Sequence, residues 1–230
     1  DASIVDICWG PGFALLAWVY CAPFNAFTPR AIVVAVLVTV WAVRLAAHLL
    51  RRHHGEDPRY RSMRDAHGRA FWWRSLFTVF WLQAVILWFV ALPVLVAARA
   101  TEPAGVTATD IAGVLLFAVG LAFEAIGDSQ LEHFRAVPAN RGRVLNSGLW
   151  RYTRHPNYFG DAVLWWGVFL IACSAPGGWL TAASPLLMTV LLLRVSGVTL
   201  LERSLNASKP GYAEYMKRTS AFVPWFPRAD

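Results

Sequence analysis

The stretch that decides the fold reads LNSGLWRYTRHPNYFGD over Leu145–Asp161 and continues as AVLWWGVFLIAC over Ala162–Cys173. The first part is polar and aromatic, and the second part carries no charged residue. Similar apolar runs recur along the chain between basic connections. This alternation predicts several helices that cross a membrane, with polar chemistry at the boundary of one of them.

The composition indicates a helical membrane protein. Of the 230 residues, 57% are hydrophobic and only 15% are charged, which is more apolar surface than a soluble domain of this size can bury. The apolar runs lack the alternation of a barrel, and a helix satisfies its own backbone within lipid. We therefore expect an all-α, polytopic transmembrane bundle in a single domain, residues 1–230, with six spans at Ser3–Phe24, Ala31–Leu50, Leu76–Ala98, Thr109–Leu131, Tyr158–Cys173 and Leu180–Leu201.

The distribution of positive charge predicts the topology. Seven of the 21 Lys and Arg residues lie between the second and third spans, five between the fourth and fifth, and five after the sixth. By the positive-inside rule, these three basic segments face the cytoplasm. This placement accounts for the net charge of +7 without a nucleic-acid partner. We expect an integral protein of a bacterial inner membrane that contacts membrane lipids, and the sequence leaves its oligomeric state open.

Ionisable residues inside a span are costly in lipid unless they are paired or face a wet cavity. We therefore expect the ionisable residues of the spans, including Asp6, Arg194 and Glu202, to point inward. Glu124 and Asp128 are four residues apart, so on a helix they form a carboxylate stripe on one face. Two interpretations of the stripe stay open: an arginine neutralises it, or it belongs to a pocket that binds a charged cofactor or holds a proton donor.

The usual nucleotide and metal motifs are absent from the sequence. It contains no phosphate-binding loop, no Gly-x-Gly-x-x-Gly turn, no Gly-x-Ser-x-Gly elbow and no His-Glu-x-x-His pair. No Cys/His cluster has the spacing of metal ligands either, so we expect no metal. A nucleotide would have to be held by the region Arg135–Asp161, where arginines suit phosphates, asparagines offer amide hydrogen bonds and aromatic rings offer stacking faces.

The motif RHPNYFGD, preceded by GLWRY, resembles the signature of the steroid 5-alpha-reductase and sterol-reductase superfamily of membrane enzymes. The tail segments Leu201–Arg203, Pro210–Tyr215 and Thr219–Trp225 resemble the C-terminus of those reductases. The chain is most similar to a bacterial branch of the superfamily that carries a domain-of-unknown-function label (DUF1295). That resemblance spans nearly the whole chain and includes the segments Ser3–Phe13, Gly55–Tyr60 and Pro138–Gly142.

The resemblance implies NADPH bound on the cytoplasmic side, an apolar substrate that enters from the bilayer, and hydride transfer to a polarised carbon–carbon double bond. It also implies one further helix before the span that contains Asp6, and a cofactor-binding half at about residues 135–230. The implied cofactor-binding residues, among which we favour Asn157, Tyr158, Asp161 and Glu202, are Asn140, Arg141, Asn146, Arg154, His155, Asn157, Tyr158, Asp161, Glu202, Tyr212 and Tyr215.

The catalytic groups and the substrate are less closely defined by the resemblance. The chain lacks the Gln-Glu pair with which steroid 5-alpha-reductases polarise the steroid ketone, so the lipid-like substrate stays open among steroid, sterol and isoprenoid enones. Asp6, Glu124 and Asp128 are candidates for the missing acid, provided that burial keeps the carboxyl protonated. Tyr158 is a further catalytic candidate.

Two other functions compete with a reductase. An Arg-His-Pro-x-Tyr motif followed by Gly also occurs in membrane methyltransferases of the isoprenylcysteine carboxyl methyltransferase type, which use S-adenosylmethionine. We rank this alternative second, because a cationic grip suits the phosphates of NADPH better than a phosphate-free methyl donor. A non-catalytic lipid-binding protein ranks third, because it leaves the concentration of Asn, Tyr and Arg unexplained.

Overall fold

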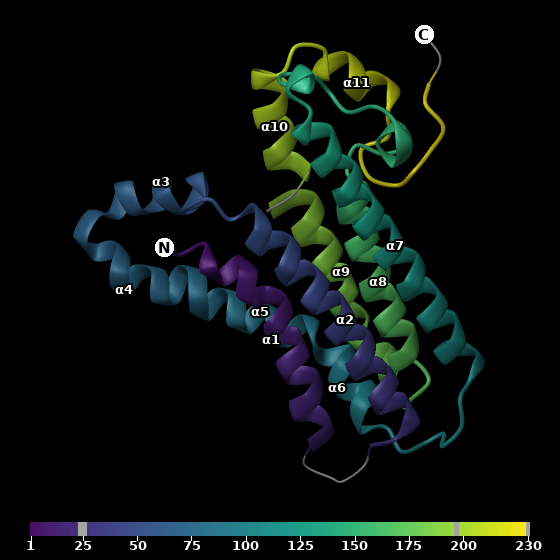
Figure 1. Ribbon diagram of the computed structural model, residues 1–230. Helices are drawn as coiled ribbons and strands as arrows, with labels where there is room; N and C mark the ends of the chain where they lie inside the picture. The colour runs from purple at the N-terminus through teal and green to yellow at the C-terminus, as the bar shows by residue number, and fades with distance from the viewer. Residues whose placement is uncertain (23–26, 196–197, 229–230) are drawn as a thin grey trace. The chain divides into compact units, whose positions relative to one another are not determined.

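The computed structural model describes residues 1–22, 27–195 and 198–228, which form helices joined by loops (Figure 1). Over these ranges the chain forms no strand, and its β-type pairing is limited to an isolated bridge between Thr153 and Ser220. The expected all-α class is confirmed. The main helices are α1 (Ile4–Cys21), α2 (Pro29–Arg52), α3 (Pro58–His67), α4 (Phe71–Ser75), α5 (Leu82–Val90), α6 (Leu92–Arg99), α7 (Ala108–Ala136), α8 (Pro156–Ala172), α9 (Ala183–Val190), α10 (Val198–Ser208) and α11 (Tyr212–Arg218).

The expected membrane-spanning character is also confirmed. In the described part of the chain, five helical stretches are long and apolar enough to cross a membrane: Ile4–Cys21, Pro29–Arg52, Pro58–Val90, Ala108–Ala136 and Gly178–Val195. The remaining expected span corresponds to α8, which is shorter at 17 residues, as its short apolar run predicts. The expected end of the first span at Phe24, and positions 196–197 of the sixth span, lie outside the described residues.

The third span begins earlier than the sequence predicts. Gly68 ends α3 with a φ of +50°, a conformation that glycine adopts without steric cost, and Figure 1 shows the chain reversing between α3 and α4. The helical path then runs from Phe71 through a π-helical turn at Leu76–Trp81 to Val90. It is interrupted at Ala91, where Pro93 in the first turn of α6 offers no backbone N–H.

The chain divides into two compact units, of which unit 1 comprises Asp1–Asp110 and Ile171–Ser184. Its main contact joins α1 to α2. A Cβ added at Gly10 would lie 2.8 Å from the carbonyl oxygen of Ala42, so the two backbones touch at this point. The rings of Phe13 and Trp41 meet edge to face beside it, 5.6 Å apart, and both side chains are fully buried.

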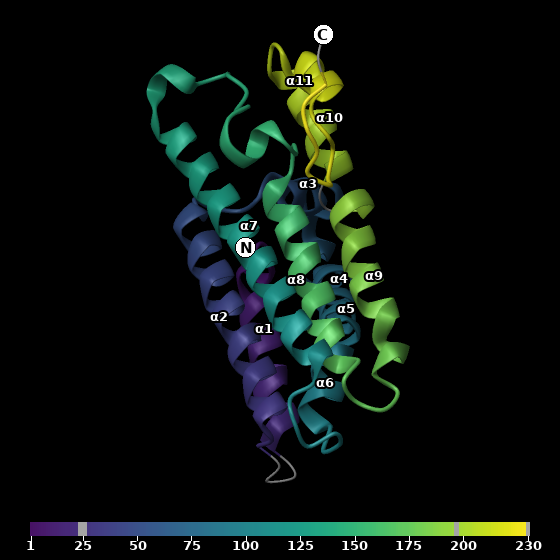
Figure 2. The same ribbon diagram turned by 90° about the vertical axis from the view of Figure 1, so that its right-hand side faces the viewer.

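Unit 2 comprises Ile111–Leu170 and Pro185–Asp230, and α7 and α8 lie side by side within it (Figure 2). These helices pack through a seam of glycines. A Cβ at Gly120 would lie 2.6 Å from the Gly160 carbonyl oxygen, and one at Gly167 would lie 2.6 Å from the Phe117 amide nitrogen. Larger residues would force the backbones apart. The single domain expected over residues 1–230 stays a prediction.

Candidate functional site

The two sequence motifs that define the candidate site fold onto each other in unit 2. The segment before α8 runs beside the C-terminal segment, and Thr153 bridges to Ser220. The Arg154 amide donates to the Ser220 carbonyl at 2.9 Å, and the Thr153 hydroxyl donates to the Phe222 carbonyl at 2.8 Å. The two motifs are therefore in contact although more than sixty residues lie between the bonded positions. The side chains of both motifs converge at this contact.

Arg154 occupies the centre of this convergence. Its Nε and Nη2 atoms donate to the two carboxylate oxygens of Glu202 at 2.7 and 3.2 Å, which is a two-pronged ion pair. Its Nη1 atom donates to the backbone carbonyls of Met216 and Thr219 at 2.8 and 2.6 Å. Because a guanidinium has five N–H groups, these four bonds leave Arg154 at most one further donor for a ligand.

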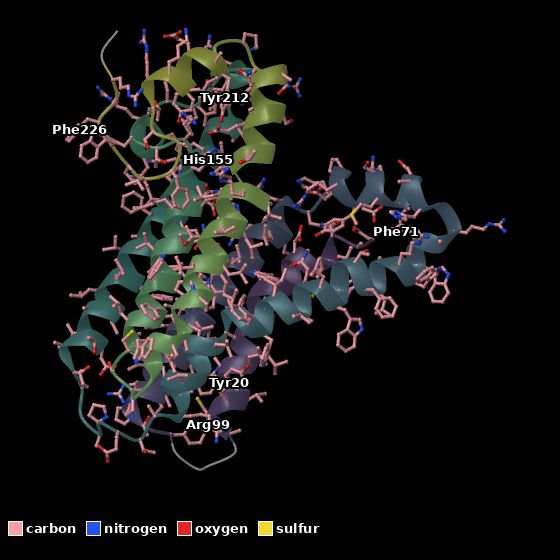
Figure 3. All side chains as sticks on the ribbon, turned by 180° about the vertical axis from the view of Figure 1, so that it is seen from behind. Tyr20, Phe71, Arg99, His155, Tyr212 and Phe226 are labelled. Atoms are coloured by element: carbon pink, nitrogen blue, oxygen red, sulfur yellow. The ribbon has the colours of Figure 1, made fainter. Side chains whose placement is uncertain are left out.

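His155 shares the same carboxylate. Its Nε2 atom lies 3.0 Å from Oε1 of Glu202, and its side chain is only 1% exposed (labelled in Figure 3). The carboxylate accepts, which assigns the proton to Nε2. One face of the imidazole stacks on the Tyr158 ring, with ring centroids 5.5 Å apart and an interplanar angle of 6°. Tyr158 and His155, both predicted from the motif, are thus in contact.

The charge of Glu202 is stabilised by these neighbours. Burial by itself raises the pKa of a carboxyl group, but the hydrogen bonds from His155 and Arg154 outweigh burial and bring the pKa of Glu202 below its usual value. Glu202 is therefore ionised at neutral pH. The cluster combines a permanent cation, a carboxylate and an imidazole within direct hydrogen-bonding distance, an arrangement that can bind an anion or relay a proton.

Two tyrosines from α11 pack beside this cluster. Burial raises the pKa of Tyr212 to about 12, and it also raises the pKa of Tyr215, so both phenols stay protonated at neutral pH. The Tyr215 hydroxyl donates to the Trp150 carbonyl, and the Trp150 indole N–H donates to the Gly127 carbonyl at 3.0 Å. Tyr215 therefore connects α11, through Trp150, to α7.

The predicted carboxylate stripe of α7 meets the first turn of α8. The Asn157 amide donates to Oδ1 of Asp128 at 2.9 Å, and both Asp128 and Glu124 are buried. The partner of Asp128 at this contact is thus a neutral amide, which neither interpretation of the stripe predicted. Asp161 lies one turn further along α8 and is half-buried. Arg194 is exposed and lies in the last turn of its helix, where a long side chain can leave the apolar layer; whether it faces a wet cavity, as expected, stays a prediction.

Four predicted residues make no contact within the Arg154 cluster as described, three of them in unit 2 and Asp6 in unit 1. Asn140 donates its side-chain amide to the Phe134 carbonyl at 2.9 Å, which satisfies an acceptor at the end of α7. Arg141 and Asn146 are exposed on the connection between α7 and α8.

Asp6 takes part in a second polar group that the sequence did not reveal in full. The Tyr60 hydroxyl donates to one carboxylate oxygen of Asp6 at 2.8 Å, and Arg59 donates to the other at 2.9 Å. The amide of Gln83 reaches the same Tyr60 hydroxyl at 3.4 Å. Tyr60 belongs to the segment Gly55–Tyr60, which carries part of the family resemblance, so the sequence indicated its importance. Its contact with Asp6, 54 residues away, depends on the fold.

No metal centre is evident: among the described residues, no three His, Cys, Asp or Glu side chains are grouped so that they could hold a metal ion.

Comparison with known proteins defines the family. The sequence profile of the family described as "Protein of unknown function (DUF1295)" matches residues 1–219. The chain belongs to the DUF1295 family. This DUF1295 protein is also similar to the uncharacterized protein C594.04c of Schizosaccharomyces pombe. The two are 27% identical over an alignment of length 262, which covers all of this chain and 74% of the relative. No solved structure gives a significant match.

Proposed function

We propose that this DUF1295 protein is a membrane reductase that uses NADPH to reduce a carbon–carbon double bond in a lipid-like enone, such as a steroid, sterol or isoprenoid. The observation that carries the proposal is the buried cluster in which Arg154 and His155 of one motif share the carboxylate of Glu202 from the other. Both motifs are those that resemble the reductase superfamily. Their convergence is what a common cofactor site requires.

Polar and aromatic residues on the connection between α7 and α8 and at the start of α8 suit a dinucleotide with phosphates. The exposed connection between α7 and α8 presents Arg141 and Asn146, which suit phosphate and ribose oxygens. Asn157 and the Tyr158 ring stand at the start of α8, where an amide and a flat aromatic face suit a nicotinamide or adenine group. When bound, NADPH supplies the hydride.

The other requirements of the reaction, positioning of the groups and transfer of a proton, fall to residues of the chain. The Arg154–Glu202 pair fixes α10 against the start of α8, and Glu202 in turn fixes the His155 ring. Glu124, Asp128 and Tyr158 are the candidates in unit 2 for delivering a proton to the carbon next to the one that receives the hydride. The remaining candidate acid, Asp6, lies in unit 1, where its carboxylate accepts from Tyr60 and Arg59, and its catalytic role stays a prediction. The apolar helices exclude water from the hydride.

The test is binding of NADPH, NADH and S-adenosylmethionine to the detergent-purified protein, measured by thermal shift and calorimetry. A ligand that binds only the folded state raises its apparent stability. Selective stabilisation by NADPH, followed by NADPH oxidation when enone lipids are added, supports the proposal. Selective stabilisation by S-adenosylmethionine replaces it with a methyltransferase, and no response to any of the three replaces it with a non-catalytic lipid-binding protein.

Variants locate the site within the same experiment. Asn157→Ala and Asp161→Ala should each weaken NADPH binding by about tenfold, the loss expected for one hydrogen bond to a charged ligand. Asn206→Ala is the matched control, because Asn206 is an exposed amide on α10. Wild-type affinity in both site variants would refute the placement of the cofactor at the start of α8.

A further inference from the structure

The C-terminal segment Ser220–Arg228 forms a strap that is held to the start of α8. Besides the Arg154–Ser220 and Thr153–Phe222 hydrogen bonds, the Trp225 amide donates to the Tyr152 carbonyl at 2.9 Å. At its far end, the Arg228 amide donates to the Arg218 carbonyl at 2.9 Å. The strap therefore has a defined backbone path over unit 2.

The strap lies at the boundary between the polar and apolar parts of α8. The Phe222 ring meets the Phe159 ring edge to face, with centroids 5.8 Å apart, and Phe159 is in the first turn of α8. From Ala162 onward, α8 has no charged residue. In a membrane this height on the helix corresponds to the interface between head groups and acyl chains, where tryptophan and other aromatic residues concentrate.

The outer side of the strap is unusually apolar for a segment outside the spans. Val223, Trp225 and Phe226 are 59%, 71% and 76% exposed, and Figure 3 shows Phe226 at the outer edge of unit 2. The Phe226 ring is supported from one side by the ring of Tyr152, 6.1 Å away at 80°. These side chains form an exposed apolar surface. A polar ligand such as a nucleotide would not cover this surface, so its partner should itself be apolar.

A cationic pocket of about 280 Å³ opens beside the same apolar surface. It is lined by side chains of the strap and of the end of α11, and its cations are Arg154, Lys217, Arg218 and Arg228. Two carboxylates partly offset them: Glu202 pairs with Arg154, and the exposed Glu214 lies 3.4 Å from Lys217 and 3.2 Å from Arg218. The pocket therefore keeps an excess of positive charge.

We infer that this pocket and the adjoining strap bind the phosphate head group of an anionic phospholipid, with Trp225 and Phe226 inserted among the neighbouring acyl chains. Phosphate complements the arginines, which bind it through paired N–H groups. The lipid source is favoured over a free phosphate because the exposed apolar side chains adjoin the cations at the height of the membrane interface. The C-terminal segment is one of the basic segments expected on the cytoplasmic side, where the leaflet carries anionic lipid. The inference does not depend on the reductase activity.

The experiment compares lipids with identical acyl chains on the full chain in neutral detergent, by thermal shift and by native mass spectrometry. Phosphatidylglycerol should stabilise the protein and remain bound in the mass spectrometer, whereas phosphatidylcholine should do so much more weakly. Glycerol 3-phosphate and inorganic phosphate, which offer the phosphate without acyl chains, should have little effect at the same concentration. Equal stabilisation by phosphatidylcholine, or by either free phosphate, would overturn the inference.

Paired variants test the pocket itself. Arg218→Gln with Arg228→Gln should weaken phosphatidylglycerol binding by about 25-fold, which is about fivefold for each arginine near an anionic surface. Trp225→Ala with Phe226→Ala should also weaken the binding of phosphatidylglycerol. The same pair of changes should leave the weak response to glycerol 3-phosphate unchanged, because that ligand has no acyl chains. Arg51→Gln and Trp179→Ala, which change an exposed arginine and an exposed tryptophan of unit 1, are the matched controls and should bind as the wild type does.

NADPH binding separates this inference from the proposed function. The Arg218→Gln/Arg228→Gln variant should keep its NADPH response, because neither residue is assigned to the cofactor. If phosphatidylglycerol displaces NADPH, or if this variant loses both ligands, the pocket belongs to the cofactor and the lipid inference fails while the reductase proposal stands. If NADPH never binds but the lipid selectivity is observed, the reductase proposal fails and the lipid site stands.

Discussion

Each unit of the protein buries an arginine in a two-pronged ion pair, and the two pairs differ in what surrounds them. In unit 1, Nε and Nη2 of Arg30 donate to the Asp110 carboxylate at 2.9 and 3.0 Å. The remaining Arg30 bonds go to the carbonyls of Pro103 and Gly105, in an exposed loop. The Asp110 carboxylate accepts further from Thr107, a neutral residue.

The pair in unit 2 has an imidazole neighbour in place of that hydroxyl. Glu202 accepts from His155 as well as from Arg154, and the other carbonyl partners of Arg154 include that of the buried Thr219. The same ion pair thus serves two purposes. In unit 1 it is surrounded by loop carbonyls and a hydroxyl and holds a connection in place; in unit 2 it also orients a buried imidazole, which lies beside the residues of the candidate site.

The largest effect is expected at Arg154. Arg154→Met removes the cation that pairs with Glu202, which keeps the His155 N–H, and leaves two backbone carbonyls without their donor. The free energy of unfolding should therefore fall by about 3–5 kcal/mol. Adding Glu202→Gln removes the orphaned charge but not the orphaned carbonyls, so about 2 kcal/mol of the loss should remain. Denaturant unfolding in detergent measures both. A double variant as stable as the wild type would show that the carbonyls of Met216 and Thr219 find water.

The matched pair in unit 1 should recover more completely. Arg30→Met alone should also cost about 3–5 kcal/mol, because it leaves the Asp110 carboxylate buried and uncompensated. In Arg30→Met/Asp110→Asn, the asparagine can still accept from Thr107, and the loop carbonyls can bind water, so the loss should shrink to about 1 kcal/mol. The same unfolding assay decides. Equal residual losses in the two double variants would remove the distinction between the two centres.

The pH dependence of stability should distinguish Glu202. Its pKa in the folded protein is below its usual value, so its contribution to stability is complete above the unfolded-state pKa of about 4.3 and is lost as the pH falls through the folded-state pKa. Glu202→Gln should therefore flatten the fall in stability on acidification. Denaturant midpoints measured from about pH 6 to pH 3 test this.

Glu214 provides the control for that titration. Hydrogen bonds from Lys217 and Arg218 also lower the pKa of Glu214, but its side chain is exposed. Salt screens exposed pairs, so the effect of Glu214→Gln on the acid slope should vanish in high salt, whereas that of Glu202→Gln should persist. Acid slopes that are the same in the wild type and Glu202→Gln would mean that Glu202 does not couple folding to protons.

The smallest effect is expected at the rim of the unit 2 centre. Tyr215→Phe removes the donor to the buried Trp150 carbonyl and should cost about 1 kcal/mol. Tyr152→Phe, which alters a more exposed tyrosine, should change stability by less than about 0.5 kcal/mol. Stability is again read from the denaturant midpoint. A larger loss at Tyr152 than at Tyr215 would show that the hydroxyl contact with Trp150 contributes little.

The sequence predicted the helices well because lipid leaves few alternatives for an apolar run of this length. Its main error of placement, the start of the third span, arose at Phe71–Ser75. Phe71, Trp72 and Trp73 are apolar, but Arg69 and Arg74 flank them, so the charges masked the beginning of the helix. Propensity and hydropathy alone do not decide where a helix continues through such a boundary.

The sequence predicted the candidate site less completely. It assigned no role to Gly160, whereas a Cβ at this position would lie 2.5 Å from the Glu124 amide nitrogen, so the glycine serves the contact between α7 and α8. A signal for this contact was available: Gly113, Gly120 and Gly127 recur every seven residues, which places them on one helix face.

The amino-acid sequence alone was enough to predict the helical class, the approximate spans, the basic segments and the chemical types of residue in the candidate site. These properties follow from local composition and spacing, because the cost of burying charge and unpaired backbone in lipid acts on every short segment separately. Only the tertiary structure decided which residues meet: Arg154 with Glu202, Asn157 with Asp128, and the C-terminal strap with the start of α8. Pairings between segments far apart in the chain depend on packing and hydrogen-bond geometry, which local spacing does not specify.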